Sequence, residues 1–186
     1  MKVEFVEQYL KTCSELVNDK KIIEPAMRGA DLLRLSASNG RKVIFAGNGA
    51  SAAIASHAAL DFTKQAKIRS NCFNEPAFLT AFANDYGYEN WLKKALELHM
   101  DKDDVVVLIS SSGTSPNIVN AAEYVRSCEN ELITFTGFDS DNPCNLLSTL
   151  GFWVDCRAYN IIEGVHQIWL LMICDMIIGK SEYSVK

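Results

Sequence analysis

The 186-residue sequence has few of the features that mark secreted or multidomain proteins. It has only four prolines, and no Gly/Ser-rich or Pro-rich linker or repeat interrupts it, which predicts a single domain over residues 1–186. Its six cysteines include no CxxC pair, so we expect reduced, mostly buried thiols rather than a disulfide framework. The first residues do not combine a basic stretch with an apolar one, so we expect a cytosolic protein.

An excess of positive charge is also missing. Eighteen Lys and Arg residues against 23 Asp and Glu residues give a formal net charge of −5. The sequence therefore predicts no direct binding to nucleic acid or to an anionic membrane, and favours a small ligand or a protein partner. The hydrophobic fraction of 48% and the charged fraction of 22% exclude global disorder.

The most apolar segment, residues 161–178, is not typical of a membrane span. It contains Glu163, His166, Gln167 and Asp175, which would be costly to place in a bilayer. We expect a buried helix there.

Short β-prone runs alternate with helical stretches along most of the chain. Residues 42–46 form one such run, which breaks into the glycine turn 47–51 and then into an Ala-rich helical stretch. The same unit recurs at 105–109, where the serine-rich turn 110–115 precedes a helix. The remaining predicted elements are strands at 132–136 and 152–154 and a short helix at 145–147. Apolar strands joined by helical crossovers predict an α/β fold with a doubly wound parallel sheet flanked by helices.

An N-terminal extension of about residues 1–39 precedes this pattern. Its apolar residues recur at helical spacing and stop at Asn39-Gly40, which predicts two helices. Their apolar positions lie on more than one face, and the Ala-rich and Gly-rich helices that follow favour close packing. Both features favour a symmetric homo-oligomer.

Two loops are candidates for binding a phosphate, because each follows a predicted strand and opens a helix. Free backbone N–H groups and the positive end of a helix favour an anion at such a place. In residues 110–115, five of six positions carry hydroxyl groups, more than one helix cap requires and suitable for a phosphomonoester. Neither loop has the glycine spacing of a dinucleotide site or the Gly-Lys-Ser/Thr ending of a P-loop, so we expect no nucleotide cofactor. The alternative is that both are ordinary turns.

Two pairs of polar residues are candidates for acid–base chemistry. His57 and Asp61 are four apart in the helix after the first loop, and Glu163 and His166 are three apart near the start of the last helix. Such spacings often arise by chance on a helix surface, which is the alternative for both pairs. An aldose–ketose isomerase needs a group to shuttle a proton between adjacent carbons and an acid for the carbonyl oxygen, and this set contains both types.

Three segments together resemble the sugar isomerase (SIS) domain family, closest to its phosphoheptose isomerase branch. They are Gly47-Asn-Gly-Ala-Ser-Ala-Ala-Ile-Ala-Ser-His57, Asn84-Asp-Tyr-Gly-Tyr88 and Ser110-Ser-Ser-Gly-Thr-Ser-Pro-Asn117. The resemblance covers about the whole chain. It implies the flavodoxin-like SIS-type sheet, a homotetramer with sites at subunit boundaries, and a sugar phosphate as substrate. The substrate-binding residues that it implies are Asn48, Gly49, Ser51, Asp85, Ser110, Ser111, Ser112 and Ser115.

The resemblance also implies where the chemistry takes place. His57 matches a family histidine, Asp61 stands where the family has its glutamate base, and Glu163 stands where it has a glutamine. The position of the late-helix acid is occupied by Leu171, so the acid would be His166 or Glu163. The donors of His57, Asp61 and Glu163 suit zinc, and the two carboxylates would also accept manganese or magnesium.

Two functions follow from this set of residues. The first is a sedoheptulose 7-phosphate-type isomerase of heptose biosynthesis, with Asp61 as base and an altered acid. The second is a phosphosugar-binding regulator or scaffold without turnover, like the DiaA-type replication regulators of the same family. We favour the first, because His57 and two acids remain in the predicted cleft.

Overall fold

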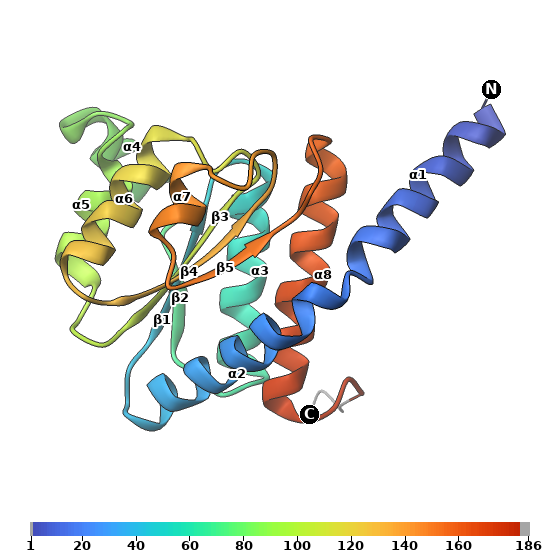
Figure 1. Ribbon diagram of the computed structural model, residues 1–186. Coiled ribbons are helices and arrows are strands. Elements are labelled where there is room, and N and C mark those ends of the chain that lie inside the picture. The colour runs from blue at the N-terminus through green and yellow to red at the C-terminus, as the bar shows by residue number, and fades with distance from the viewer. Residues whose placement is uncertain (1, 183–186) are drawn as a thin grey trace.

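The computed structural model describes residues 2–182 and shows a five-stranded sheet with helices on both faces (Figure 1). All strand pairs are parallel, in the order β2-β1-β3-β4-β5. This is the predicted doubly wound α/β architecture. The elements in chain order are α1 (Lys2–Val17), the 3-10 turn η1 (Lys20–Ile22), α2 (Ile23–Ser38), β1 (Val43–Gly47), α3 (Ala50–Lys64), β2 (Ser70–Cys72), α4 (Pro76–Tyr86), α5 (Trp91–His99), β3 (Val105–Ser110), α6 (Pro116–Ser127), β4 (Glu131–Thr136), α7 (Pro143–Leu147), β5 (Leu150–Trp153) and α8 (Tyr159–Ile178).

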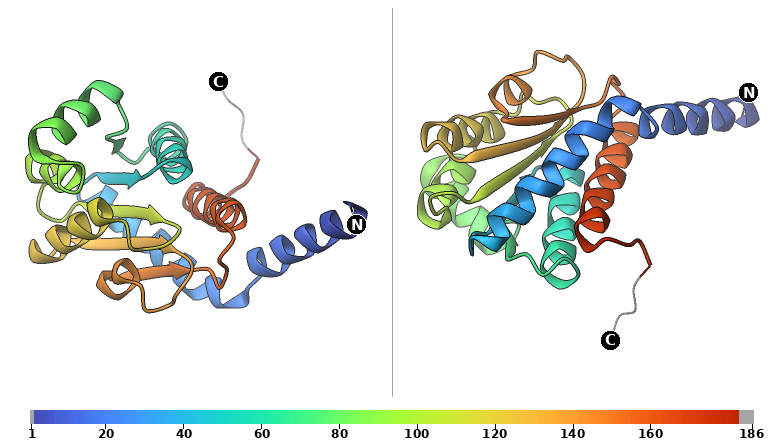
Figure 2. Two further views of the ribbon diagram at one scale, coloured as in Figure 1. Left: turned by 90° about the horizontal axis from the view of Figure 1, so that it is seen from above. Right: turned by 60° about the horizontal axis from the view of Figure 1, so that its bottom comes forward.

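Alternate residues of each central strand enter two separate cores. Val43 and Phe45 of β1 pack in the core that α2, α3 and α8 cover, whereas Ile44 and Ala46 pack in the core that α5 and α6 cover. Figure 2 shows these helix layers on either side of the sheet. Both faces of the strands are therefore buried, which is why β1 and β3 are continuously apolar in sequence.

The strand register brings the ends of three strands together. Gly47 of β1 pairs with Ile109 of β3, and Ser110 of β3 pairs with Thr136 of β4. Helix α3 follows β1 after residues 48–49, and α6 follows β3 after residues 111–115. The two predicted loops therefore lie side by side at the carboxyl edge of the sheet, where ligands of such sheets bind.

The predicted strands and helices are present, with boundaries shifted by at most two residues. Four elements were not predicted: η1, β2, α4 and α5, of which β2 is a three-residue edge strand without an apolar run. The cysteines carry no disulfide, but the expectation that most are buried is wrong, because only Cys144 and Cys174 are. The four prolines all lie in the first turn of a helix, where the missing N–H is tolerated.

The first and last helices differ sharply in burial. Helix α1 has no buried residue and projects from the body of the molecule (Figures 1 and 2). Helix α8 is long and apolar enough to cross a membrane by length and composition alone. It instead packs against α2 and α3 with eight buried residues, so the prediction of a buried helix is confirmed.

Candidate active site

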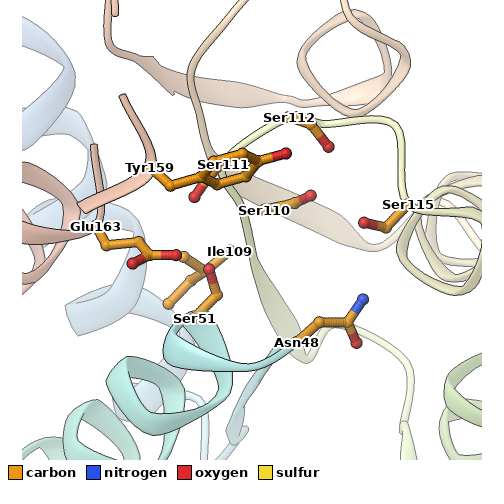
Figure 3. A pocket seen from close by; sticks show the side chains of 9 residues that line it. All are labelled: Asn48, Ser51, Ile109, Ser110, Ser111, Ser112, Ser115, Tyr159 and Glu163. Atoms are coloured by element: carbon orange, nitrogen blue, oxygen red, sulfur yellow. The ribbon is translucent and has the colours of Figure 1, made fainter. Parts of the chain in front are cut away.

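A pocket of about 120 Å³ lies where the ends of β1 and β3 meet the first turns of α3 and α8 (Figure 3). Its lining residues are Asn48, Ser51, Ile109, Ser110, Ser111, Ser112, Ser115, Tyr159 and Glu163. Six of the eight predicted substrate-binding residues are therefore in one place. Gly49 does not line the pocket but has a φ of +55° beside Asn48, a backbone conformation that favours glycine and turns the chain into α3. Asp85 is exposed and does not line it.

The serine loop, residues 110–115, leaves hydroxyl groups available to a ligand. The Ser111 hydroxyl is buried and has no hydrogen-bond partner among the described residues. Ser115 occupies the N-cap position of α6, yet its side chain makes no capping hydrogen bond. The loop itself is held by other contacts, including Thr114 Oγ1 to Ser112 Oγ at 3.0 Å and Cys144 N to the Gly113 carbonyl at 3.2 Å. Unused hydroxyls on a fixed loop are suited to bind phosphate oxygens.

The pocket attracts an anion through helix ends rather than through basic side chains. Neither lysine nor arginine is among its lining residues in the described chain. The N-terminal turns of α3, α6 and α8 contribute Ser51, Ser115 and Tyr159 to the lining. Each such turn presents backbone N–H groups and a partial positive charge, which together favour a phosphate.

A second polar group, which we name the acid–base cluster, lies between α3 and α8 and consists of His57, Asp61 and Gln167. Gln167 Nε2 is 2.7 Å from His57 Nδ1, and His57 Nε2 is 3.2 Å from Asp61 Oδ2. An amide nitrogen can only donate, so His57 Nδ1 accepts and the ring proton sits on Nε2, directed at Asp61. The predicted His57–Asp61 pair therefore exists, and Gln167 fixes its orientation.

The acid–base cluster is linked to the pocket by both helices. Gln167 lies one turn after Glu163 on α8, and Ser51 begins the same helix that carries His57. Figure 3 places Glu163 beside Ser51 in the pocket. Beyond the cluster, burial and the nearby Asp61 carboxylate raise the pKa of Asp175. A ligand anchored at the serine loop could therefore extend along α3 and α8 toward Asp61.

The residues expected to hold zinc do not form a metal-binding group in this structure. Both ring nitrogens of His57 are engaged, one by Gln167 and the other by Asp61. Glu163 lines the pocket, one helical turn before Gln167 on α8. Within residues 2–182, no three His, Cys, Asp or Glu side chains gather in a way that could hold a metal ion. We therefore derive no step through a metal.

His166 does not lie beside Glu163 in the pocket, contrary to its expected role as an acid. Its ring is fully buried against Phe135, and Nε2 is 3.1 Å from the Thr136 carbonyl oxygen. Burial lowers the pKa of His166 to about 4, although the hydrogen bond to Thr136 opposes this shift. The structure therefore assigns His166 to the core.

A model of the SIS domain family matches residues 4–137 of the chain. The chain belongs to the SIS domain family. Among curated relatives, the phosphoheptose isomerase of Citrifermentans bemidjiense is 30% identical, and the alignment covers 100% of this chain and 99% of that protein. The phosphoheptose isomerase of Aliarcobacter butzleri is 28% identical, covering 95% and 97% of the two chains.

Solved structures of SIS proteins agree with this assignment. A phosphoheptose isomerase from Francisella tularensis superposes with a TM-score of 0.85 at 25% identity, covering 95% of this chain and 96% of the other. One from Neisseria gonorrhoeae also has a TM-score of 0.85, at 26% identity and 94% and 96% coverage. The fold and family that the three sequence segments predicted are thus confirmed.

The structure also shows site residues that sequence reasoning missed. Tyr159 lines the pocket and Gln167 orients His57. Gln167 follows Glu163 by four residues, so helical spacing alone could have placed both on one face. Leu171, at the family's late-helix acid position, lines an apolar groove with Met172 on the outer side of α8 and offers no proton.

Proposed function

We propose that the chain is a phosphosugar aldose–ketose isomerase of the phosphoheptose type, acting in heptose biosynthesis in the cytosol. The observation that carries this proposal is the pocket with the unused hydroxyls of Ser111 and Ser115, from which α3 and α8 lead to an oriented His57–Asp61 pair. Two relatives of matching length named phosphoheptose isomerase support the substrate class.

The serine loop binds the phosphate in this proposal. Ser111 and Ser115 donate their unused hydroxyls, Ser51 donates from the first turn of α3, and the helix ends stabilise the negative charge. This anchor leaves the rest of the sugar chain to extend away from the loop.

The length of the sugar determines which carboxylate meets the reacting carbons. Asp61 lies ten residues after Ser51 on one helix, which is about 15 Å along the axis at 1.5 Å per residue. Glu163 lies beside Ser51 in the pocket, near the phosphate. A long, extended sugar phosphate therefore carries its carbonyl end farther from Glu163 and farther toward Asp61 than a short one does.

Asp61 is the base in this proposal and His57 is the hydrogen-bond donor. Asp61 takes the proton from the carbon next to the carbonyl. The substrate exchanges the bond from His57 Nε2–H to Asp61 for one from Nε2–H to the carbonyl oxygen, where it stabilises the developing charge. The hydroxyl proton passes between the two neighbouring oxygens, and Asp61 returns its proton to the adjacent carbon. Gln167 holds the ring of His57 in the tautomer that this step needs.

We also propose a homotetramer, for which the exposed side of α1 is the main support. Val3, Val6 and Leu10 fall at helical spacing and are each more than half exposed. A partner copy would cover this apolar face. Asp85, which is exposed and lies outside its own pocket, would then be available to a neighbouring site.

Removing a single hydroxyl tests the proposed phosphate site. Ser115→Ala deletes a group that makes no capping bond, so the protein should stay as stable as the wild type. Its affinity for sedoheptulose 7-phosphate in calorimetry should fall about tenfold or more, because a hydrogen bond to a charged group contributes about 1.5–3 kcal/mol. Ser127→Ala, at the other end of α6, is the matched control and should bind normally. Equal binding by Ser115→Ala and the wild type would contradict the placement of the phosphate.

The same proteins decide between an isomerase and a binding protein. The wild type should interconvert sedoheptulose 7-phosphate and its aldose, followed by NMR, and Ser115→Ala should do so with a raised KM. Tight binding without interconversion would favour the regulatory function.

A further inference from the structure

Asn48 and Asn117 form a reciprocal amide pair across the two loops of the pocket. Asn48 Nδ2 donates to Asn117 Oδ1 at 2.9 Å, and Asn117 Nδ2 donates to Asn48 Oδ1 at 2.9 Å. Asn48 follows β1, whereas Asn117 lies in the first turn of α6 and is 1% exposed. The pair therefore joins the glycine turn to the end of the serine loop at a buried point.

A third side chain also bonds the oxygen of Asn48. The Tyr88 hydroxyl, from the segment between α4 and α5, donates to Asn48 Oδ1 at 3.2 Å. The oxygen of Asn48 thus accepts two hydrogen bonds, which use both of its lone pairs. Its nitrogen has two protons, of which Asn117 takes one. The other N–H donor has no partner within residues 2–182.

The unused donor lies on the pocket side. Asn48 lines the pocket, and Figure 3 shows its amide nitrogen turned toward Ser115, with its oxygen turned the other way. With the opposite amide orientation, an oxygen would face the place where the serine hydroxyls and helix ends favour an anion. Asn117 bonds both groups of the Asn48 amide, and Tyr88 donates a second hydrogen bond to its oxygen, so the three contacts together hold the amide in the orientation that leaves N–H on the pocket side.

We propose that Asn117 and Tyr88 are positioning residues that hold the Asn48 side chain as an N–H donor to the phosphate of the substrate. This inference rests on the proposed phosphate site and gives Asn48 a phosphate contact rather than a contact to the sugar chain. Asn117 touches no ligand itself and acts through Asn48. Tyr88 is half exposed, so its contribution is smaller and separable from the stability of the core.

A double-mutant cycle tests the pair, with binding of inorganic phosphate as the readout. Asn48→Leu and Asn117→Leu should each lower phosphate affinity about tenfold, and the double variant should bind no worse than the weaker single variant. Tyr88→Phe should lower affinity about threefold without a change in thermal stability. Ser127→Ala is the control, since Ser127 lies at the other end of α6 and its hydroxyl donates to the Tyr124 carbonyl.

Side-chain NMR gives a readout that a purely structural role would not change. Added phosphate should shift one of the two Asn48 side-chain N–H protons strongly, and the proton that is bonded to Asn117 only weakly. In Tyr88→Phe, which keeps the core intact, the same proton should shift less at equal phosphate concentration.

The outcomes separate this inference from the proposed function. A wild type that binds neither phosphate nor sedoheptulose 7-phosphate would overturn both. Normal phosphate binding by Asn117→Leu and Tyr88→Phe, additive losses in the cycle, or no shift of an Asn48 proton would overturn only the positioning role.

Discussion

At the level of single residues, burial separates the two histidines of the candidate site. The side chain of His57 is 46% exposed, so a substrate can reach it, and Gln167 and Asp61 bond its two ring nitrogens. His166 is fully buried with one backbone partner, so it must stay neutral. Sequence spacing treats the two residues alike, and only the packing of α8 against the sheet distinguishes them.

The burial of His166 predicts a loss of stability in acid. Its pKa falls from 6.5 in the unfolded chain to about 4 in the folded one, so between these values the unfolded state binds the extra proton. The free energy of unfolding should decrease as the pH falls through this window, by roughly 2 kcal/mol between pH 7 and pH 5. Urea unfolding at both pH values measures this change.

His166→Gln provides the comparison, because glutamine can donate to the Thr136 carbonyl but does not titrate. The variant should lose less stability than the wild type between pH 7 and pH 5. An equal loss in both proteins would show that His166 is not the buried neutral group described above.

At the level of elements, the serine loop depends on a close approach that requires glycine. Gly113 has a φ of +66°, and a Cβ there would lie 1.9 Å from Asn142 Oδ1. Asn142 caps α7 by accepting from Asn145 N at 2.9 Å, so it cannot move without loss of that cap. The serine loop and α7 can therefore pack this closely only if residue 113 is glycine.

Alanine substitution at two glycines should have opposite effects on stability. Gly113→Ala should lower the melting temperature and weaken phosphate binding, because both the backbone and Asn142 must shift. Gly164→Ala, within α8 and with nothing within 4 Å of its Cβ, should stabilise the protein by about 0.5–1 kcal/mol. Differential scanning calorimetry measures both. A stabilising Gly113→Ala would show that the loop is not held as described.

The same elements show what sequence patterns can predict. The units β1–α3 and β3–α6 combine an apolar run with a glycine or serine turn, so their position and the location of the serine loop followed from the sequence. The edge strand β2 has polar residues and only three positions, and α4 has no buried residue, so neither has a clear pattern. Gln167 bonds His57, 110 residues away, and Asn117 bonds Asn48, 69 residues away. Such contacts depend on how the helices pack, so local sequence patterns do not predict them.

At the level of the whole molecule, the exposed apolar side of α1 has no partner within a single copy of residues 2–182. The double variant Val6→Lys/Leu10→Lys should reduce the mass of the proposed tetramer in light scattering, because it places charges on the apolar side of α1. Gln8→Lys, on the opposite side of the helix, should leave the mass unchanged. An unchanged mass in the double variant would exclude this side of α1 from the interface.

Hydrogen exchange at the reacting carbon tests the central claim that Asp61, and not Glu163, moves the substrate proton. In deuterated water, the wild type should introduce deuterium next to the carbonyl of sedoheptulose 7-phosphate, observed by NMR. Asp61→Asn should slow this exchange by about 10²–10⁴ while binding persists, whereas Glu163→Gln should retain it. Exchange that survives in Asp61→Asn but is lost in Glu163→Gln would contradict the assignment of the base. Binding without any exchange by the wild type would contradict the isomerase itself.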